Sequence, residues 1–423
     1  MNHQRAEGVI LAKGDGWIFV ALLMGIVCIG EALKVFRTPA LLMIVLVAAI
    51  YARENMLRRQ NLPVLLFSAW TLVCVILSYL DAFPNAWTRY HDKSVIFQQA
   101  SFLAVLLPLV SASQKWWDDP RFDVNREAIL VAVVFCAFLV GWVFDIVFGI
   151  EGSVERRPFV TMRSYLFLAL LALSYLAFRS KQWRGPAILL LLLLLGLSVW
   201  RPLFLQNTIV YLTLGGFLVI AMFRLPVDRL MLGVFIVLLA AATIYGLLNP
   251  LRVFSVDPNT GWRLAWWKDA LEALGQTGGI GVGFGTESLR NEYSALLERD
   301  SYGEEGGSFL LISTHSAFFD TMLRTGFVGV LLFGIVLARC FPLSFMAPLT
   351  RAHCCAMFAV LILCLHSNLG LQSPMYSIGV AICIGYLQSE RRKAYAGASA
   401  AKGLRAEISP RATSLAEPSR NRH

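Results

Sequence analysis

Residues 227–250 of the chain read VDRLMLGVFIVLLAAATIYGLLNP. As a helix, this apolar run is long enough to cross a hydrocarbon core of about 30 Å. Its apolar residues do not alternate with polar ones as they would in a half-buried strand. Asn249 and Pro250 end the run and open a polar stretch that continues to Thr314. Similar apolar runs recur along the chain, so the sequence predicts an all-α polytopic membrane protein with one long polar loop.

The composition indicates that lipid is the main solvent of the chain. Of its 423 residues, 57% are hydrophobic and 15% are charged, and the mean hydropathy is +0.64. Because every backbone polar group must be satisfied within lipid, segments of this kind are expected to be helices. We expect about twelve transmembrane helices, over residues 16–34, 39–52, 62–80, 95–113, 128–149, 162–179, 186–200, 203–223, 227–248, 316–338, 352–370 and 374–389.

These spans divide the chain into four parts. Residues 1–248 form an N-terminal transmembrane bundle of about nine spans, and residues 249–315 form the long loop between spans nine and ten. Residues 316–393 carry about three further spans. Residues 394–423 are rich in Ala, Ser, Arg and Gly without apolar periodicity, which predicts a disordered tail.

The distribution of Lys and Arg predicts the orientation, because short loops rich in these residues remain on the cytoplasmic side. The register that places both termini in the cytoplasm gathers most basic loops there, for example those containing Arg58, Arg126 and Arg184. The long loop then lies on the outer face. The net charge of +10 therefore serves topology and anionic headgroups, and no nucleic-acid partner is needed to explain it.

Several classes of function lack their sequence motifs. The chain has no P-loop, no Gly-x-Gly-x-x-Gly after a strand and no His-Glu-x-x-His. Its eight cysteines lie in or beside the apolar spans, so the outer loop has neither a disulfide scaffold nor a cysteine zinc site. We therefore expect chemistry that requires no metal and no cofactor.

Arginines gather on the predicted outer face, where the positive-inside rule disfavours them. They are Arg156, Arg157, Arg163, Arg201, Arg252 and Arg263. Guanidinium groups bind phosphate oxygens bidentately, so an anionic ligand at the level of the headgroups would account for several of them. For Arg156 and Arg157, snorkelling to lipid headgroups is an equal alternative. Arg201 follows Trp200 between two apolar spans and has no polar loop to occupy, which favours a functional role.

His315 is the candidate catalytic residue. It precedes the apolar span that begins at Ser316, where a histidine is often only a cap or an interface residue. Ser313 or Thr314 can cap that helix instead, and the helix dipole favours the neutral imidazole that accepts a proton. Asp320 and Arg324 follow at i, i+4 spacing and could form an intramembrane pair or support the site; the spacing favours the pair.

Two segments of the loop carry further patterns. Residues 261–271 read GWRLAWWKDAL, which predicts an amphipathic helix with tryptophans suited to a membrane interface. Residues 278–285 read GGIGVGFG, a turn-forming strip whose backbone can approach a ligand closely. A hinge or a simple connector would explain the glycine strip equally well.

Together these residues resemble the signature region of the bacterial O-antigen ligase and O-antigen polymerase family. The resemblance covers residues 250–335: Arg263 with its tryptophans, the strip at 281–285, then Thr314-His315-Ser316-Ala317-Phe318-Phe319 and Gly326-Phe327-Val328-Gly329. Family members usually carry Asn after the histidine and a Ser-Arg pair at the earlier outer arginine. This chain has Ser316 and Trp200-Arg201 at those places.

The resemblance implies an inverting glycosyltransferase of the bacterial inner membrane. It would move a glycan from undecaprenyl pyrophosphate to an acceptor sugar hydroxyl on the periplasmic face, with membrane lipids around it and without a cofactor. His315 would be the general base, and Arg263, Arg201, Arg157 and Arg163 would bind the donor. The acceptor would be lipid A core in a ligase, which is slightly favoured, or a lipid-linked repeat unit in a polymerase. A polysaccharide or polyprenyl-lipid transporter is a third interpretation.

Overall fold

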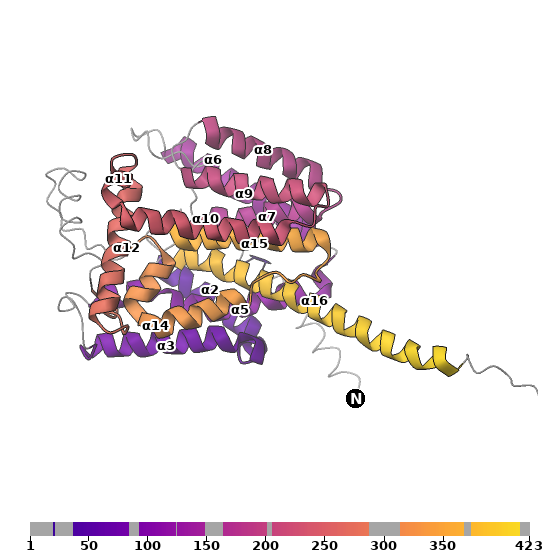
Figure 1. Ribbon diagram of the computed structural model, residues 1–423, viewed down its shortest axis with the longest axis horizontal. Coiled ribbons are helices and arrows are strands. Elements are labelled where there is room, and N and C mark those ends of the chain that lie inside the picture. Colours follow the sequence, from indigo (N-terminus) through magenta and orange to yellow (C-terminus); the bar gives the residue numbers. More distant parts are fainter. Residues whose placement is uncertain are drawn as a thin grey trace, which may run out of the picture.

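The computed structural model describes residues 20–21, 37–83, 93–123, 125–148, 164–200, 205–286, 314–367 and 374–414. Within these ranges the protein is all-helical and contains no strand (Figure 1). The helices are α2 (Arg37–Met56), α3 (Leu62–Tyr79), α4 (Lys93–Gln99), α5 (Phe102–Asp118), α6 (Arg126–Phe148), α7 (Ser164–Arg179), α8 (Arg184–Trp200), α9 (Leu205–Met222), α10 (Asp228–Leu248), α11 (Pro250–Phe254), α12 (Pro258–Gln276), α14 (Ala317–Ala338), α15 (Pro348–Ser367) and α16 (Pro374–Ser414).

Most predicted spans coincide with one of these helices. The first, 16–34, lies outside the described residues except at positions 20 and 21. The fourth, 95–113, lies in α4 and α5, which are separated by a turn at Ala100 and Ser101 and together form one apolar segment, Val95–Asp118. The break leaves Gln99 at the end of α4, where its side chain binds the glycine strip described below.

Five segments are long and apolar enough to cross a membrane. They are Arg59–Tyr79, Val95–Asp118, Asp228–Leu248, Ala317–Ala338 and Pro348–His366. Three shorter apolar helices, Phe167–Arg179, Arg184–Val199 and Ile209–Met222, lie among them. The all-helical class is thus confirmed for the described residues, and the number of twelve spans stays a prediction.

Several of these helices expose apolar side chains outward. Leu72 of α3, Leu189 of α8 and Val237 of α10 are exposed by 51%, 69% and 66%. In α10 only 11% of the most apolar stretch is buried. An aqueous surface with apolar side chains on this scale would be unfavourable, whereas lipid tails solvate them. The outer surface is therefore suited to a hydrocarbon environment.

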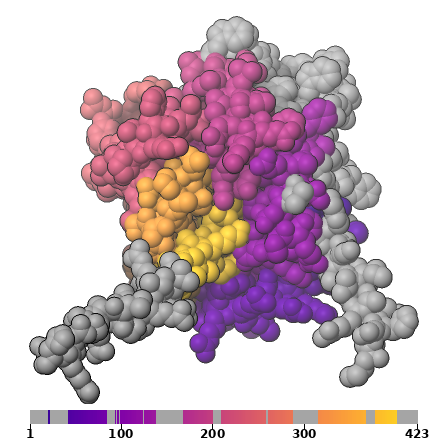
Figure 2. Space-filling view, turned by 90° about the vertical axis from the view of Figure 1, so that its right-hand side faces the viewer, coloured from indigo at the N-terminus to yellow at the C-terminus, as the bar shows by residue number. Residues whose placement is uncertain are grey.

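The last helix, α16, occupies the centre of the bundle. Figure 1 shows α15 and α16 between a group formed by α6 to α10 and a group formed by α2, α3, α5 and α14. Its residues 377–390 are all buried, and α16 packs against α5, α7 and α15. Gly385 allows a close approach to α5, since a Cβ there would lie 2.5 Å from Ser113 Cβ. Figure 2 shows this helix surrounded by its neighbours where it leaves the bundle.

Helix α16 covers the first part of the tail that the sequence predicts to be disordered, and the disorder of that tail stays a prediction. Helix α16 continues without a break to Ser414 and extends beyond the bundle (Figure 1). Ten of residues 394–407 are Ala, Lys, Arg, Leu or Glu, which have high helix propensities, and these outnumber the two glycines at 397 and 403. Residues 415–423 lie outside the described part of the chain.

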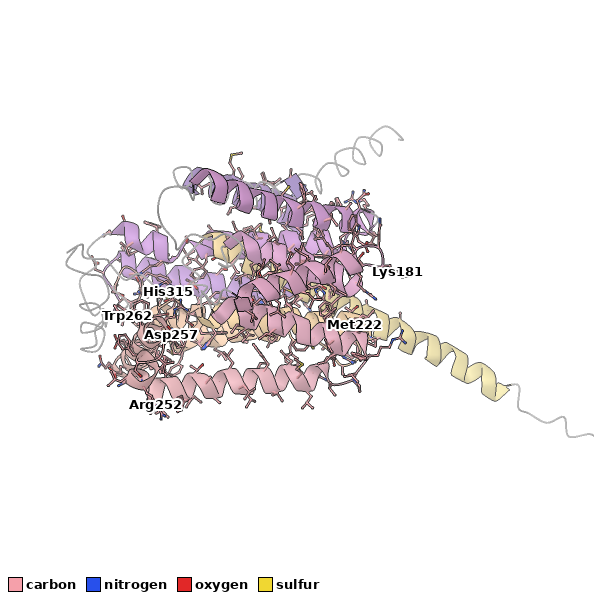
Figure 3. The ribbon with its side chains drawn as sticks, turned by 90° about the horizontal axis from the view of Figure 1, so that it is seen from above. Lys181, Met222, Arg252, Asp257, Trp262 and His315 are labelled. Atoms are coloured by element: carbon pink, nitrogen blue, oxygen red, sulfur yellow. The ribbon has the colours of Figure 1, made fainter. Side chains whose placement is uncertain are left out.

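Polar contacts close the end at which α16 leaves the bundle. Arg179 of α7 forms an ion pair with Glu390 of α16, and Arg351 of α15 pairs with Asp228 of α10 at 2.7 Å. Lys181 lies at this end, opposite the end that contains His315 (Figure 3). The two ends therefore differ: one is closed by paired charges, and the other carries the candidate site.

Helix α14 is interrupted at Gly326, which has φ +65° and ψ −163°. The glycine strip fills the interruption. Val282 N–H donates to Leu323 O at 2.8 Å, and Phe327 N–H donates to Gly279 O at 2.9 Å. Backbone groups freed by a break in an apolar helix must find such partners. The strip and α14 therefore form one packed unit.

We expect Gly326→Ala to lower the free energy of unfolding by about 3 kcal/mol, because this conformation is essentially restricted to glycine. A Cβ would also lie 2.4 Å from both Gly279 O and Ile280 O. Gly334→Ala in the same helix is the control, since a Cβ there meets nothing within 4 Å. It should stabilise the helix by about 0.5–1 kcal/mol. Denaturant unfolding in detergent measures the free energy of unfolding of both variants. Equal changes in the two would contradict the special role of the Gly326 conformation.

Candidate functional site

The candidate site lies at one end of the bundle, around α12 and the start of α14. Figure 3 shows His315, Trp262, Asp257 and Arg252 at this end and Lys181 and Met222 at the other. Helix α12 includes the amphipathic helix predicted over residues 261–271, and it packs against α10, α11 and α14. The described first part of the polar loop thus folds back onto the bundle.

The tryptophans of α12 point into the protein. Trp262, Trp266 and Trp267 are exposed by only 6%, 5% and 4%. Trp267 stacks on Phe319 of α14 with the ring centroids 4.9 Å apart. The sequence predicts a tryptophan face at the membrane interface, whereas these rings fix α12 to α14. This packing brings Arg263, which lies one turn before Trp266 and Trp267 on the same face, towards the start of α14.

His315 lies where α12 meets α14. Its ring is stacked on that of Trp266, with a centroid separation of 5.4 Å and an angle of 19°. The residue has φ +54°, in the left-handed region that non-glycine residues seldom adopt. Ser316 is the N-cap of α14, instead of the predicted Ser313 or Thr314. His315 is therefore presented from a short, conformationally restricted turn.

Burial of the ring, and secondarily the positive charge of Arg263, lowers the pKa of the His315 imidazole from 6.5 to about 4. A lowered pKa of His315 is also what the sequence predicts, but there the expected cause is the dipole of α14. As a whole residue, His315 is nevertheless exposed. At neutral pH the imidazole is neutral and able to accept a proton.

Replacing Arg263 with Gln should raise the pKa of His315 towards its ordinary value, because the nearby positive charge is removed. The pH dependence of diethyl pyrocarbonate modification, followed at the His315 peptide by mass spectrometry, gives this pKa. Lys268→Gln, which removes a charge elsewhere on α12, should leave it unchanged. Because the folded pKa lies below the ordinary one, the free energy of unfolding should decrease as the pH falls from 6.5 towards 4. Identical midpoints in wild type and Arg263→Gln would contradict the proximity of the two side chains.

Hydrogen bonds hold the turn before His315. Thr314 N–H donates to Asp320 Oδ1 at 2.8 Å, and Trp267 Nε1–H donates to Thr314 O at 2.9 Å. The Thr314 hydroxyl donates to Ser316 O at 3.1 Å. Each of these partners belongs to a helix or to the turn itself. The position of His315 is thus set by α12 and α14 together.

Asp320 and Arg324 contact different groups of the loop, and the predicted pair between them stays a prediction. Asp320 binds Thr314, whereas Arg324 Nη1–H donates to Gly283 O at 3.2 Å and to the Thr286 hydroxyl. Buried groups of the loop thus provide contacts for both side chains, whose i, i+4 spacing alone suggests only a local pair. Asp320 and Arg324 therefore support the loop.

The glycine strip is a packed connector. Phe284 N–H donates to the Ser78 hydroxyl at 2.8 Å, and Gly285 N–H donates to Gln99 Oε1 at 2.6 Å. Gly281 N–H donates to the Thr277 hydroxyl at 3.0 Å. Because these N–H groups are already bound by the protein, they do not form a cradle for a phosphate. The connector interpretation is the one that the structure supports.

The described residues include only part of the predicted site. His315 stacks on Trp266 at the junction of α12 and α14, near enough to Arg263 for the guanidinium charge to help lower the pKa of the imidazole. Arg157, Arg163 and Arg201 lie outside the described residues, so their predicted roles stay predictions. Among the described residues no cluster of three His, Cys, Asp or Glu side chains could hold a metal ion.

The sequence did not predict the contacts of His366. This residue, near the end of α15, has its Nε2 2.8 Å from the Thr243 hydroxyl, and its ring lies 4.7 Å from that of Trp267. The Ser316 hydroxyl contacts Leu365 O beside it. The only sequence signal is a polar residue that ends an apolar span. His366 therefore joins α10 and α15 to the aromatic packing beneath the site.

Comparison with known proteins provides no relative. No family model matches the chain, and no curated protein matches it. The resemblance of residues 250–335 to the ligase and polymerase family therefore stays a prediction, and the functional interpretation rests on the chemistry of the site.

Proposed function

We propose that the chain is a metal-independent, inverting glycosyltransferase of the bacterial inner membrane. It moves a glycan from undecaprenyl pyrophosphate to an acceptor sugar hydroxyl at the periplasmic face. The observation that carries this proposal is the junction of α12 and α14, at one end of a bundle with an apolar outer surface. There the His315 ring stacks on Trp266 of α12, and the charge of Arg263 on the same helix helps to lower the pKa of the imidazole.

The proposed reaction uses both side chains. The neutral His315 takes the proton of the acceptor hydroxyl while its oxygen forms a bond to the sugar C1. The bond between C1 and the pyrophosphate oxygen breaks on the opposite face, and its electron pair remains on the leaving undecaprenyl pyrophosphate. Arg263 stabilises that developing negative charge. His315 then releases its proton, which restores the enzyme. Cleavage of the glycosyl pyrophosphate drives the transfer, so no nucleotide is consumed.

The rest of the proposal concerns topology and donor binding. The chain crosses the membrane twelve times with both termini in the cytoplasm, and residues 249–315 lie in the periplasm. Arg201, Arg157 and Arg163 join Arg263 in binding the pyrophosphate. The polyprenyl chain lies in the membrane beside the apolar helices, which explains why the phosphate ligands belong at the level of the headgroups.

Two acceptors are compatible with this chemistry. Transfer to lipid A core would make the protein an O-antigen ligase, which we favour slightly. Transfer to a lipid-linked repeat unit would make it a polymerase of O-antigen, capsule or exopolysaccharide. A transporter of polysaccharide or polyprenyl lipid would explain the apolar helices and the arginines, but it gives no role to a neutral histidine beside Arg263.

The decisive experiment is a transfer assay with purified protein. The protein receives an undecaprenyl-pyrophosphate glycan without ATP or metal, together with lipid A core and excess lipid-linked repeat as competing acceptors. Product on lipid A core would assign a ligase, and extended repeats would assign a polymerase. Transfer to neither acceptor, by protein that is folded and active in lipid binding, would favour the transporter.

A further inference from the structure

The residue that precedes His315 is held from both sides. Thr314 is fully buried, with an exposure of 0%. Its N–H is bound by the Asp320 carboxylate, and its C=O is bound by the Trp267 indole. These two groups belong to the two peptide planes that flank Thr314. Fixing both planes fixes the direction in which the chain enters His315.

The conformation of His315 shows why such a constraint is needed. A non-glycine residue at φ +54° carries a strain of about 1–3 kcal/mol, and it keeps that conformation only when its surroundings impose it. Without the bonds at Thr314, the turn would relax towards negative φ. The imidazole would then leave its stacked position on Trp266.

We propose that Asp320 is a positioning residue whose carboxylate, through Thr314, holds the His315 imidazole where the acceptor hydroxyl is deprotonated. This assignment rests on the proposed function, because it takes His315 as the base. Asp320 is 7% exposed, and a charge-assisted hydrogen bond gains strength when water is excluded. Since Asp320 belongs to the first turns of α14, it ties the turn to a rigid element. It requires no contact with the substrate.

The next residue provides a matched control. Thr321 is also buried, with an exposure of 4%, and its hydroxyl has no hydrogen-bond partner within the described structure. Thr321→Val therefore alters the same turn of α14 without removing a hydrogen bond. Asp320→Ala removes the acceptor for Thr314 N–H, whereas Asp320→Asn keeps a side-chain oxygen at the same position. The Asn variant also guards against a simple loss of folding.

The test compares wild type and the three variants in two measurements. Transfer kinetics give kcat and the KM values of donor and acceptor. The rate of diethyl pyrocarbonate modification at the His315 peptide reports on the imidazole without any need for activity. We expect Asp320→Ala to lower kcat by about 10- to 100-fold, because a displacement of about 1 Å has effects of this order. Both KM values should stay close to wild type, and the modification rate should change.

Asp320→Asn and Thr321→Val test whether the effect of Asp320→Ala comes from the lost hydrogen bond. Asp320→Asn should recover most of the lost kcat, and Thr321→Val should match wild type in both measurements. An unchanged kcat and modification rate in Asp320→Ala would overturn the proposal, as would an equal loss in Thr321→Val. A rise in KM without a fall in kcat would also overturn it, because it would indicate direct contact with substrate. If wild type transfers no glycan, the proposed function fails, and the modification rates still decide whether Asp320 holds His315.

Discussion

Replacing His315 with Asn should lower kcat for glycan transfer by about 10²- to 10⁴-fold, the range that general-base catalysis contributes. The imidazole is the group that the proposed reaction uses to remove the acceptor proton. Its pKa is lowered to about 4, so the neutral form is available over the whole neutral range. Asn has no group that accepts this proton at neutral pH. The KM of the donor should change little, because the pyrophosphate contacts the arginines.

Asn is the appropriate replacement for His315 because the residue at this position must adopt a positive φ. His315 has φ +54°, and Asn tolerates this region better than Ala does. A loss of kcat in His315→Asn can therefore be assigned to the missing imidazole and not to a distorted turn. The control is the unfolding midpoint in detergent, which should be the same in the variant and in wild type. Full activity in the variant would refute the general base and would leave only binding functions for the site.

Replacing Arg263 with Gln should lower kcat by about 10²- to 10³-fold, as the loss of one preorganised group that stabilises developing charge does. In the proposed reaction negative charge collects on the leaving pyrophosphate, and Arg263 is the described cation beside the base. Arg263→Lys retains the charge but loses the planar fork that binds two oxygens at once. It should therefore be intermediate, with a loss of about 10-fold.

Assays at pH 8 keep His315 neutral in every variant, so they separate the charge at Arg263 from the pKa of the base. Arg252 provides the control: it is an exposed arginine of α11 at the same end of the bundle (Figure 3). Arg252→Gln should leave kcat within about two-fold of wild type, because exposed charges contribute little. A comparable loss in both variants would mean that overall positive potential matters, and not the placement of Arg263.

The parts of the fold that follow from local chemistry were predictable. The apolar run of α10 has to be a helix in lipid, and its end follows from Asn249 and Pro250. The meeting of Arg263 and His315 was suggested only by the resemblance, because 51 intervening residues separate them. The Trp267–Phe319 contact that brings their helices together is tertiary, and periodicity carries no signal for it.

The contacts that the sequence did not predict have the same origin. The spacing of Asp320 and Arg324 suggests a local pair, and their side chains also bind buried backbone groups of residues 314 and 283. Those backbone groups would be costly to leave without partners. The turn between α4 and α5 is likewise associated with Gln99, whose amide binds both Gly285 and Thr286. Such contacts depend on which segments meet in space, and one sequence does not reveal them.

The central place of α16 has a consequence for biogenesis. Synthesis proceeds from the N-terminus, so the helix that fills the middle of the bundle is made after α5 and α7. Until then α5 and α7 lack the helix that packs against both of them. The surrounding helices are therefore made before the central one. A chain terminated before Pro374 would contain α5, α7 and α15 but would lack the central helix α16.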